Sequence, residues 1–143
     1  MKFSFGQAEQ ERIEIDVQGY ERPACGDYWE DNWLEIDICV RAGGFSGNVE
    51  ATIMADELGK LLSQLRPLFE ILSGSAEFVT IEEQLNLRFS GDGRGHIELH
   101  GLVTDKAGAG NRLQFDLQFD QSQLGASIRE LERVVKEFPE IKE

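Results

Sequence analysis

The sequence has little cysteine, little proline and a shortage of basic residues. Its 143 residues include two cysteines, three prolines and 14 lysines and arginines. Cys25 and Cys39 have no metal-ligand spacing with each other or with histidine, which argues against a structural zinc site. We expect two reduced thiols in a cytoplasmic protein, with a Cys25–Cys39 disulfide as the less favoured alternative.

A long apolar run is also missing. A membrane-spanning helix needs roughly 20 consecutive apolar residues, and no segment approaches that length. The residues that follow Met1 do not form the apolar core of a signal peptide. Hydrophobic residues make up 41% and charged residues 29% of the chain, which is typical of a globular protein. The composition predicts a single domain over residues 1–143, with a core large enough to need no disulfide or metal.

The shortage of basic residues leaves a large negative charge. Twenty-seven acids give a formal net charge of −13, and the segment from Glu9 to Asp37 contains ten acids but only two arginines. Such a surface repels a phosphate backbone, which argues against direct nucleic-acid binding. Two interpretations remain: the charge keeps the protein soluble, or it complements a basic partner and speeds association with it.

Apolar and polar residues alternate at period two along most of the chain. This pattern is typical of strands with one buried and one solvated face, as in antiparallel sheets. The alternating segments are residues 13–17, 34–40, 49–53, 78–81, 85–89, 97–103 and 113–119.

Helical spacing interrupts the alternation twice. Apolar residues recur at steps of three and four after Asp56, the expected N-cap, and again from Asp120 to Phe138. Pro67 should kink or restart the first helix. Both helices follow a strand through an acid and a leucine, which hints at two related halves. The order predicts an α+β fold: a curved antiparallel sheet of seven or eight strands with two helices packed on one face.

The alternation of side chains along the strands predicts an acidic open face on this sheet. If Leu34 and Ile36 face the helices, the residues between them face away, and acids on the other strands join them. Tryptophans dominate many interface energies, and acids beside them add specificity and association rate. We therefore predict a partner-binding surface made of Trp29, Asp31, Trp33, Glu35 and Asp37, flanked by Glu14, Asp16, Glu98 and Asp116. The alternative is structural: Trp33 caps the sheet edge, and Trp29 tucks under an irregular acidic loop.

Motifs for catalysis or cofactor binding are weak. The segment GDGRGHIELH lacks the helix and the Lys-Ser/Thr pair of a phosphate loop, and it lacks the spaced acids of a calcium loop. His96 and His100 would lie roughly 13 Å apart along a strand, too far to share one metal ion. No G-x-S-x-G motif occurs. We expect no catalytic residues, no metal and no cofactor.

Several motifs occur in an order that resembles the WapI family of small bacterial immunity proteins. The stretch DYWEDNWLEIDICV contains a D-x-N-W-L strand start, with Glu30 or Asp31 in the place of the first acid. An E-L-x-x-L helix, an aromatic-x-x-x-E strand and an L-x-F-x-L-x-x-D-Q-x-x-L ending follow at residues 57–61, 78–82 and 113–124. The resemblance covers the chain from about Asp27 to Val135.

This resemblance implies a non-enzymatic antidote made in the cytosol. It implies a protein partner, the toxic C-terminal domain of a polymorphic or contact-dependent toxin, and such domains are often nucleases with basic clefts. We therefore expect an immunity protein that neutralises its toxin by stoichiometric binding. One alternative is a small-ligand or peptide-binding module that uses the open face of the sheet, and another is a hydrolase or isomerase that uses His96 or His100 with an acid.

Overall fold

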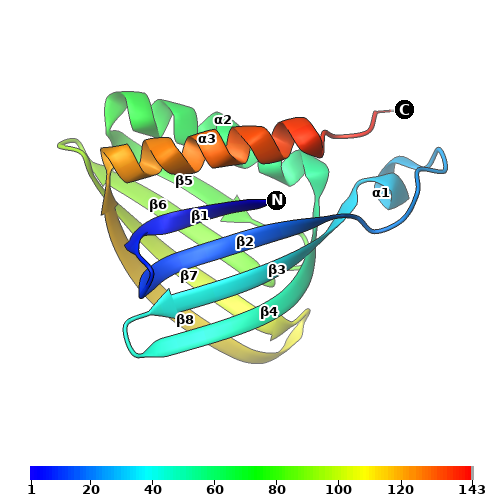
Figure 1. Cartoon of the computed structure of the whole chain (residues 1–143), viewed down its shortest axis with the longest axis horizontal. Coiled ribbons are helices and arrows are strands. Elements are labelled where there is room, and N and C mark those ends of the chain that lie inside the picture. The colour runs from blue at the N-terminus through cyan, green and yellow to red at the C-terminus, as the bar shows by residue number, and fades with distance from the viewer. Residues whose placement is uncertain (143) are drawn as a thin grey trace.

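The computed structural model describes residues 1–142, which form eight strands and three helices (Figure 1). The strands make two antiparallel four-stranded sheets in which sequence neighbours pair. Sheet A contains β1 (Lys2–Ala8), β2 (Glu11–Tyr20), β3 (Trp33–Ala42) and β4 (Phe45–Met54). Sheet B contains β5 (Ser73–Val79), β6 (Leu85–Asp92), β7 (His96–Lys106) and β8 (Ala109–Asp120).

Each sheet is followed by a helix of 17 residues, α2 (Ala55–Ile71) after sheet A and α3 (Gln121–Glu137) after sheet B. The two halves therefore share one order of elements, as the similar helix starts hinted. A short helix, α1 (Tyr28–Asp31), is inserted between β2 and β3 of the first half.

The two sheets pack with their apolar faces toward each other, and this interface is the core. The ring of Phe5 on β1 lies 4.8 Å from the ring of Phe89 on β6 and 6.4 Å from that of Phe119 on β8. Helices α2 and α3 pack on each other and against β5 and β1, so they close one side of the sandwich (Figure 1). Their leucine-rich stripes join the same hydrophobic cluster as both sheets.

The α+β class and the antiparallel strands are confirmed, but the sheet arrangement differs from the expected one. The sequence predicted one curved sheet covered by helices, whereas the structure has two sheets that cover each other. Alternation shows which residues of a strand share a face, but it does not show which strands pair. The chain leaves sheet A through α2 and starts a new sheet at β5, so β4 and β5 are not hydrogen-bonded neighbours.

A bulge in β2 changes the direction of its side chains near one end. The pairing with β3 shifts between Val17 and Gly19, which leaves Gln18 as an extra residue. An extra residue reverses the alternation beyond it. Tyr20 thereby packs against the core, and the Gln18 amide lies on the outward face of sheet A, where it donates to Asp37 (3.1 Å).

Of the two helix N-caps predicted from the sequence, the first is wrong and the second is confirmed. Helix α2 begins at Ala55, with Met54 as its N-cap, so the predicted cap Asp56 lies inside the first turn. The helix also runs through Pro67 without interruption. Helix α3 begins as predicted: the Asp120 carboxylate accepts from the Gln123 backbone N–H (3.0 Å), and the helix ends before Pro139.

Two glycine substitutions test the packing in opposite directions. A Cβ at Gly101 on β7 would lie 2.1 Å from the Phe115 ring of the neighbouring strand, so Gly101→Ala forces that buried ring to move. We expect the free energy of unfolding to fall by about 1–3 kcal/mol in urea titrations. Gly59→Ala in α2 meets no atom within 4 Å and should raise it by about 0.5–1 kcal/mol. Equal effects of the two changes would contradict the proposed packing.

Candidate functional site

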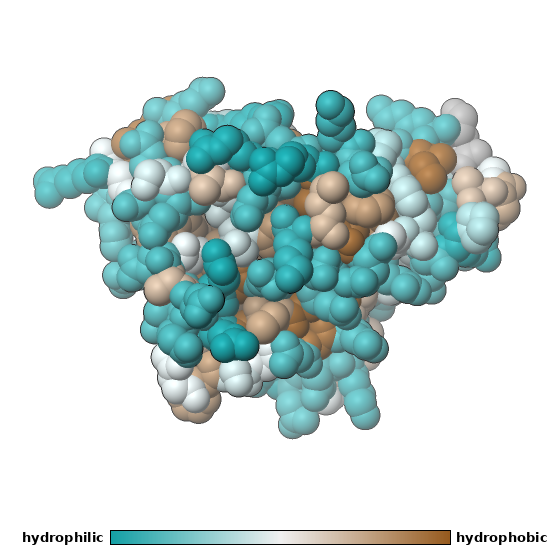
Figure 2. All heavy atoms as spheres, in the orientation of Figure 1, coloured by the Kyte–Doolittle hydropathy of each residue, from teal (hydrophilic) through white to brown (hydrophobic). Residues whose placement is uncertain are grey.

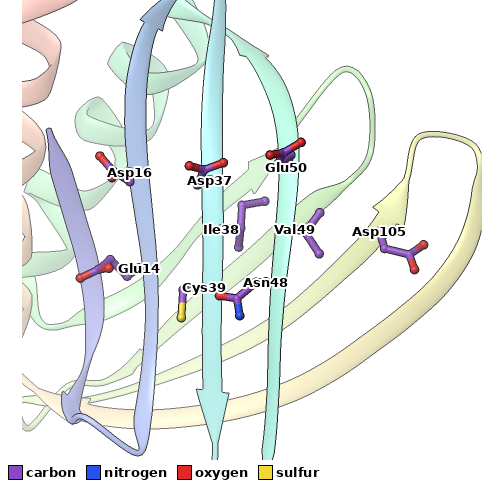
Figure 3. Close-up of a pocket in the computed structure, with 9 residues that line it drawn as sticks. All are labelled: Glu14, Asp16, Asp37, Ile38, Cys39, Asn48, Val49, Glu50 and Asp105. Atoms are coloured by element: carbon purple, nitrogen blue, oxygen red, sulfur yellow. The ribbon is translucent and has the colours of Figure 1, made fainter.

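The outward side of sheet A carries a row of aligned carboxylates. Asp16 on β2 is the direct cross-strand partner of Asp37 on β3, and Asp37 is the partner of Glu50 on β4. We call these three residues the acidic row, and Figure 3 shows them side by side across the strands. Neighbouring strands lie about 4.8 Å apart, so the three carboxylates are held at close spacing by the backbone itself.

Further acids surround this row. Glu14 and Asp105 line the same shallow hollow of about 690 Å³ as the acidic row. Glu35 lines an adjoining hollow with Asp37 and Glu50. We call the outward set Glu14, Asp16, Glu35, Asp37 and Glu50 the acidic face. The side of the molecule that carries sheet A and α3 is mostly hydrophilic, with interspersed apolar areas (Figure 2).

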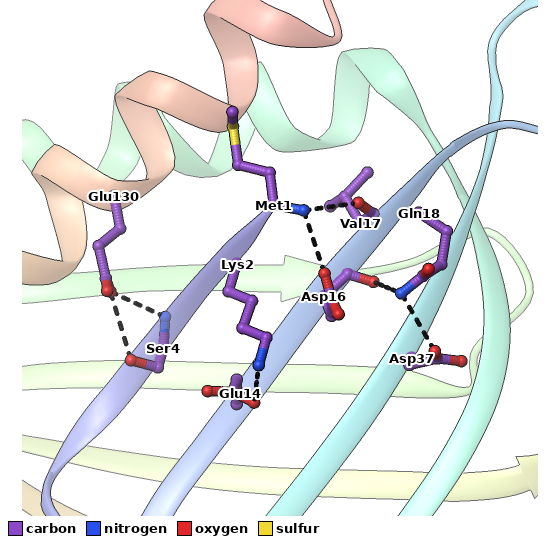
Figure 4. Close-up of polar contacts among 9 residues, drawn as sticks. All are labelled: Met1, Lys2, Ser4, Glu14, Asp16, Val17, Gln18, Asp37 and Glu130. Atoms are coloured by element: carbon purple, nitrogen blue, oxygen red, sulfur yellow. Dashed lines mark hydrogen bonds and ion pairs between the residues drawn. The ribbon is translucent and has the colours of Figure 1, made fainter.

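The positive groups around the acidic face lie at its borders, where Arg12 and Arg41 line a hollow with Glu14. The Met1 amino nitrogen lies 3.1 Å from Asp16 Oδ1, and Lys2 Nζ lies 3.6 Å from Glu14 Oε2 (Figure 4). The neutral Gln18 amide is the donor to Asp37. Among the ion pairs found in residues 1–142, none involves Glu35, Asp37 or Glu50. The middle of the face therefore keeps its negative charge.

The structure brings five of the predicted site residues together on one surface. Glu14, Asp16, Glu35 and Asp37 belong to the acidic face, and Trp33 shares their outward side of sheet A. Trp33 is half-buried at the start of β3, two residues before Glu35 on the same side of the sheet.

Glu98 and Asp116 lie elsewhere, on the outward side of sheet B. There the His100 ring contacts both acids: Nδ1 lies 2.5 Å from Asp116 Oδ1, and Nε2 lies 3.8 Å from Glu98 Oε2. Glu98 and Asp116 therefore do not join the acidic face, because their strands belong to the other sheet.

Asp31 is buried rather than presented to a partner. Its side chain is 1% exposed, and its two carboxylate oxygens accept from the backbone N–H groups of Cys25 (2.8 Å) and Gly26 (2.9 Å). The hydrogen bond from Cys25, with help from the one from Gly26, lowers the pKa of the Asp31 carboxyl below its ordinary value. Asp31 therefore holds the loop that precedes α1.

Trp29 is 59% exposed, but it lies away from the acidic face. Helix α1, not the irregular loop that the sequence predicted, carries it, and the Asp27 side chain caps this helix. Its ring lines a separate groove with residues of α2 and β5. The two tryptophans of the predicted surface therefore belong to two different surfaces.

Sequence reasoning missed Glu50, Asp105 and the contribution of Gln18. The alternation of residues 49–53 already placed Glu50 on the outward side, but its alignment with Asp37 depends on strand register. The position of Asp105 beside the hollow depends on how the two sheets pack. Gln18 reaches Asp37 only because of the bulge.

The acidic face offers carboxylate oxygens to a ligand. The described residues contain no group of three or more His, Cys, Asp or Glu side chains that could hold a metal ion. Burial raises the pKa of one carboxyl, that of Glu57, which lies outside the acidic face and accepts from the Met54 and Ile81 backbone N–H groups (2.8 Å each). Cys25 and Cys39 are free thiols. Within residues 1–142 no helix has the length and apolarity to cross a membrane.

Comparisons with known proteins agree with this architecture. The model of a family described as the immunity protein WapI-like family matches residues 4–139. No curated protein matches the chain. The solved structure of the plant transcriptional regulator PBF-2 is similar to it, with a TM-score of 0.52 over 96% of this chain and 81% of that one. The two sequences are 11% identical, so this likeness concerns the fold alone.

The acidic row should destabilise the free protein. Like charges directly opposite each other on neighbouring strands are unfavourable, so Asp37→Asn should raise the free energy of unfolding by about 0.2–1 kcal/mol in low salt. The asparagine oxygen can still accept from Gln18. Urea titrations in 20 mM and 500 mM NaCl should show the gain shrinking as salt screens the repulsion.

A matched control removes the same unit of charge elsewhere. Glu77→Gln breaks an exposed ion pair with Arg88 (3.7 Å) and should give no gain in stability. A gain from Glu77→Gln as large as that from Asp37→Asn would attribute the effect to net charge rather than to the aligned row.

The low pKa of Asp31 predicts a pH-dependent contribution to stability. A carboxyl with a lowered folded-state pKa stabilises the protein above its unfolded value, which is 3.8, and this contribution is lost as the pH falls through the folded-state pKa. Asp31→Asn should destabilise the protein at pH 7, because the amide NH₂ opposes one backbone N–H donor. The stability difference from the unsubstituted protein should stay constant from pH 7 to 5 and shrink below pH 4. A difference that does not change with pH would refute this role.

Proposed function

We propose that this chain, which belongs to the WapI-like immunity protein family, neutralises the toxic domain of a bacterial toxin by stoichiometric binding through its acidic face. Membership of an immunity protein family implies a protein partner, the toxin. In our proposal the toxin contributes a basic surface, its toxic domain is the C-terminal part of a polymorphic or contact-dependent toxin, and the complex forms in the cytoplasm without any reaction catalysed by this chain.

The alignment of the acidic row carries the proposal. Three acids that face each other across strands cost folding free energy, and among residues 1–142 no side-chain cation pairs with Asp37 or Glu50. A basic partner removes this repulsion when it binds, so the charges that oppose folding favour the complex. The long-range field of an uncompensated face also speeds the encounter with a basic surface.

The charged lining of the hollow also favours a protein partner. The hollow over the acidic row is lined by five carboxylates, from Glu14, Asp16, Asp37, Glu50 and Asp105, whereas small-molecule pockets are mostly apolar with a few polar groups. Trp33 adds an aromatic ring at the border of the face, where it can pack against a partner. The small-ligand reading of the open face is therefore the weaker one.

A nuclease domain is a suitable class of toxin for this face. Its substrate cleft must be basic to hold phosphates, and closely spaced carboxylates present a comparable density of negative charge. The same charge works against nucleic acid as a ligand of the acidic face. The His100–Asp116–Glu98 cluster on sheet B is exposed and lacks the desolvated pocket that acid–base catalysis uses.

Co-purification followed by a growth assay tests the proposal. The tagged protein, expressed in its native host, should retain a toxin fragment in equal molar amount, to be identified by mass. Expression of that fragment alone should arrest growth, and coexpression of this chain should restore growth. A captured fragment that is harmless when expressed alone, or whose toxicity this chain does not relieve, would overturn the immunity role.

Two double variants with the same net charge locate the interface. Asp37→Asn with Glu50→Gln alters the acidic face, and Glu98→Gln with Asp116→Asn alters sheet B. The first pair should weaken toxin binding at least about tenfold, mainly through a slower association rate and a smaller salt dependence. The second pair should leave affinity within about twofold, since long-range charge effects are screened. Equal losses, measured by surface plasmon resonance, would remove the acidic face from the proposal.

A further inference from the structure

A second surface, distinct from the acidic face, gathers exposed apolar side chains. A groove of about 450 Å³ lies between α1, the first half of α2 and the end of β5, and its lining includes Trp29, Asp56, Lys60, Gln64, Val79 and Ile81. We call it the Trp29 groove. Trp29 is 59%, Val79 52% and Ile81 57% exposed. Large apolar side chains that cluster on a surface mark interaction sites more often than scattered ones do.

The groove also contains an open position on a sheet edge. Strand β5 is an edge of sheet B, and α2 side chains occupy its outward backbone groups on both sides of Val79. The Gln64 amide bonds the N–H and C=O of Glu77 (2.9 Å each), and the Glu57 carboxylate accepts from the N–H of Ile81 (2.8 Å).

Val79 lies between these two positions. Backbone groups two residues apart on a strand point the same way, so the N–H and C=O of Val79 point toward the groove as those of Glu77 do. The side-chain hydrogen bonds of residues 1–142 include none to them. A hydrogen-bonding position of the edge is therefore left open in the groove that Trp29 also lines.

Buried polar groups hold Trp29 in place in this groove. Asn32 is 0% exposed; its amide nitrogen donates to the carbonyls of Tyr28 and Ile141 (2.9 Å each), and its oxygen accepts from the Ile141 N–H (2.7 Å). Tyr28 donates to Glu140, and this hydrogen bond raises the pKa of Tyr28 to about 12. Its ring meets the Trp29 ring edge-on at 5.5 Å.

This network fixes a helix of four residues that leaves its largest side chain in solvent. Buried polar groups are tolerated when they are fully bonded, but here they add no apolar burial of their own. Their effect is to preorganise the Trp29 ring, which reduces the entropy lost when a ligand packs against it.

We propose that the Trp29 groove binds an extended segment of a partner protein by adding it as a short strand beside Val79. The segment bonds the Val79 N–H and C=O and places an apolar side chain between Trp29 and Ile81, the mode in which backbone bonds give affinity and side-chain pockets give specificity. This surface and its ligand do not depend on the acidic face or on its toxin.

Charge at the rim selects a basic segment. Asp56, Glu57 and Glu77 of the lining are acidic. Lys60 pairs with Asp56 (3.0 Å) and Arg88 pairs with Glu77 (3.7 Å), so three acids meet two cations and the rim keeps a net negative charge. A segment with an apolar residue flanked by lysine or arginine fits this rim. A second copy of this chain fits poorly, because each copy carries a net charge of −13.

Synthetic peptides test this proposal directly. The probe is the acetylated, amidated peptide Lys-Val-Leu-Val-Lys, titrated to millimolar concentration into the full-length ¹⁵N-labelled protein and followed by NMR. We expect saturable shifts at the backbone amides of Val79 and Ile81 and at the Trp29 indole. The analogue in which glutamate replaces both lysines should bind at least about tenfold more weakly. Absence of saturable shifts, or equal binding of both peptides, would overturn the proposal.

Four variants separate the backbone and ring contributions. Val79→Pro removes only an N–H that points away from the sheet, a place where proline is tolerated, and should weaken the peptide about tenfold. Val79→Thr keeps the N–H and should bind within about twofold. Trp29→Ala should weaken binding at least about tenfold, whereas Phe45→Ala, which removes an aromatic ring that is 71% exposed outside the groove, should not change it.

Two further measurements distinguish the other outcomes. The variant Asp37→Asn with Glu50→Gln should bind the peptide with unchanged affinity, because the acidic face and the Trp29 groove are separate surfaces. The two proposals can therefore fail independently of each other. Sedimentation analysis of the free protein should show a monomer. A dimer that Val79→Pro dissociates would assign the groove to a second copy and refute the partner segment.

Discussion

The apolar contact between the two sheets is the constraint on which the rest of this structure depends. Each strand gives every second side chain to that contact and must turn the others outward. The inward row Ile15, Ile38 and Val49 is set by the same register as the acidic row beside it. A slip of one residue would expose those apolar side chains and bury carboxylates, so the core that stabilises the fold also fixes the spacing of the acids.

Much of the local structure could be predicted from sequence, because it depends on neighbours in the chain. The outward position of Glu35 and Asp37 follows from the apolar residues between them, and Asp120 is recognisable as a helix cap. Long-range packing was beyond such reasoning. Asp31 reads as one surface acid among many, yet backbone N–H groups of a preceding loop make it a buried acceptor. Glu98 alternates with apolar residues on its strand just as the acids of sheet A do on theirs. Alternation does not show, however, which sheet a strand joins.

The two proposed surfaces differ in the range over which they act. The acidic face works through charge, which is felt over about 8–10 Å in physiological salt and requires little detailed fit during approach. The Trp29 groove acts only on contact, and its ring and backbone groups must already be in place. The structure matches this difference: Glu35, Asp37 and Glu50 of the face are exposed, whereas α1 is held by Asn32 and Asp31, both nearly inaccessible to solvent.

The likeness to a plant transcriptional regulator at 11% identity follows from the same division between inward and outward residues. The sandwich requires apolar side chains only at alternate positions, and many combinations of them fill the same space. The intervening positions contribute little to folding, so they can change charge and shape while the backbone is kept. Function in such a fold resides on the outward positions and in insertions such as α1, which is why a shared fold does not transfer a ligand. In this chain those positions carry acids on sheet A that Met1 and Lys2 compensate only in part, and α1 carries one exposed tryptophan ring. These are the two features through which we propose that the chain binds its partners.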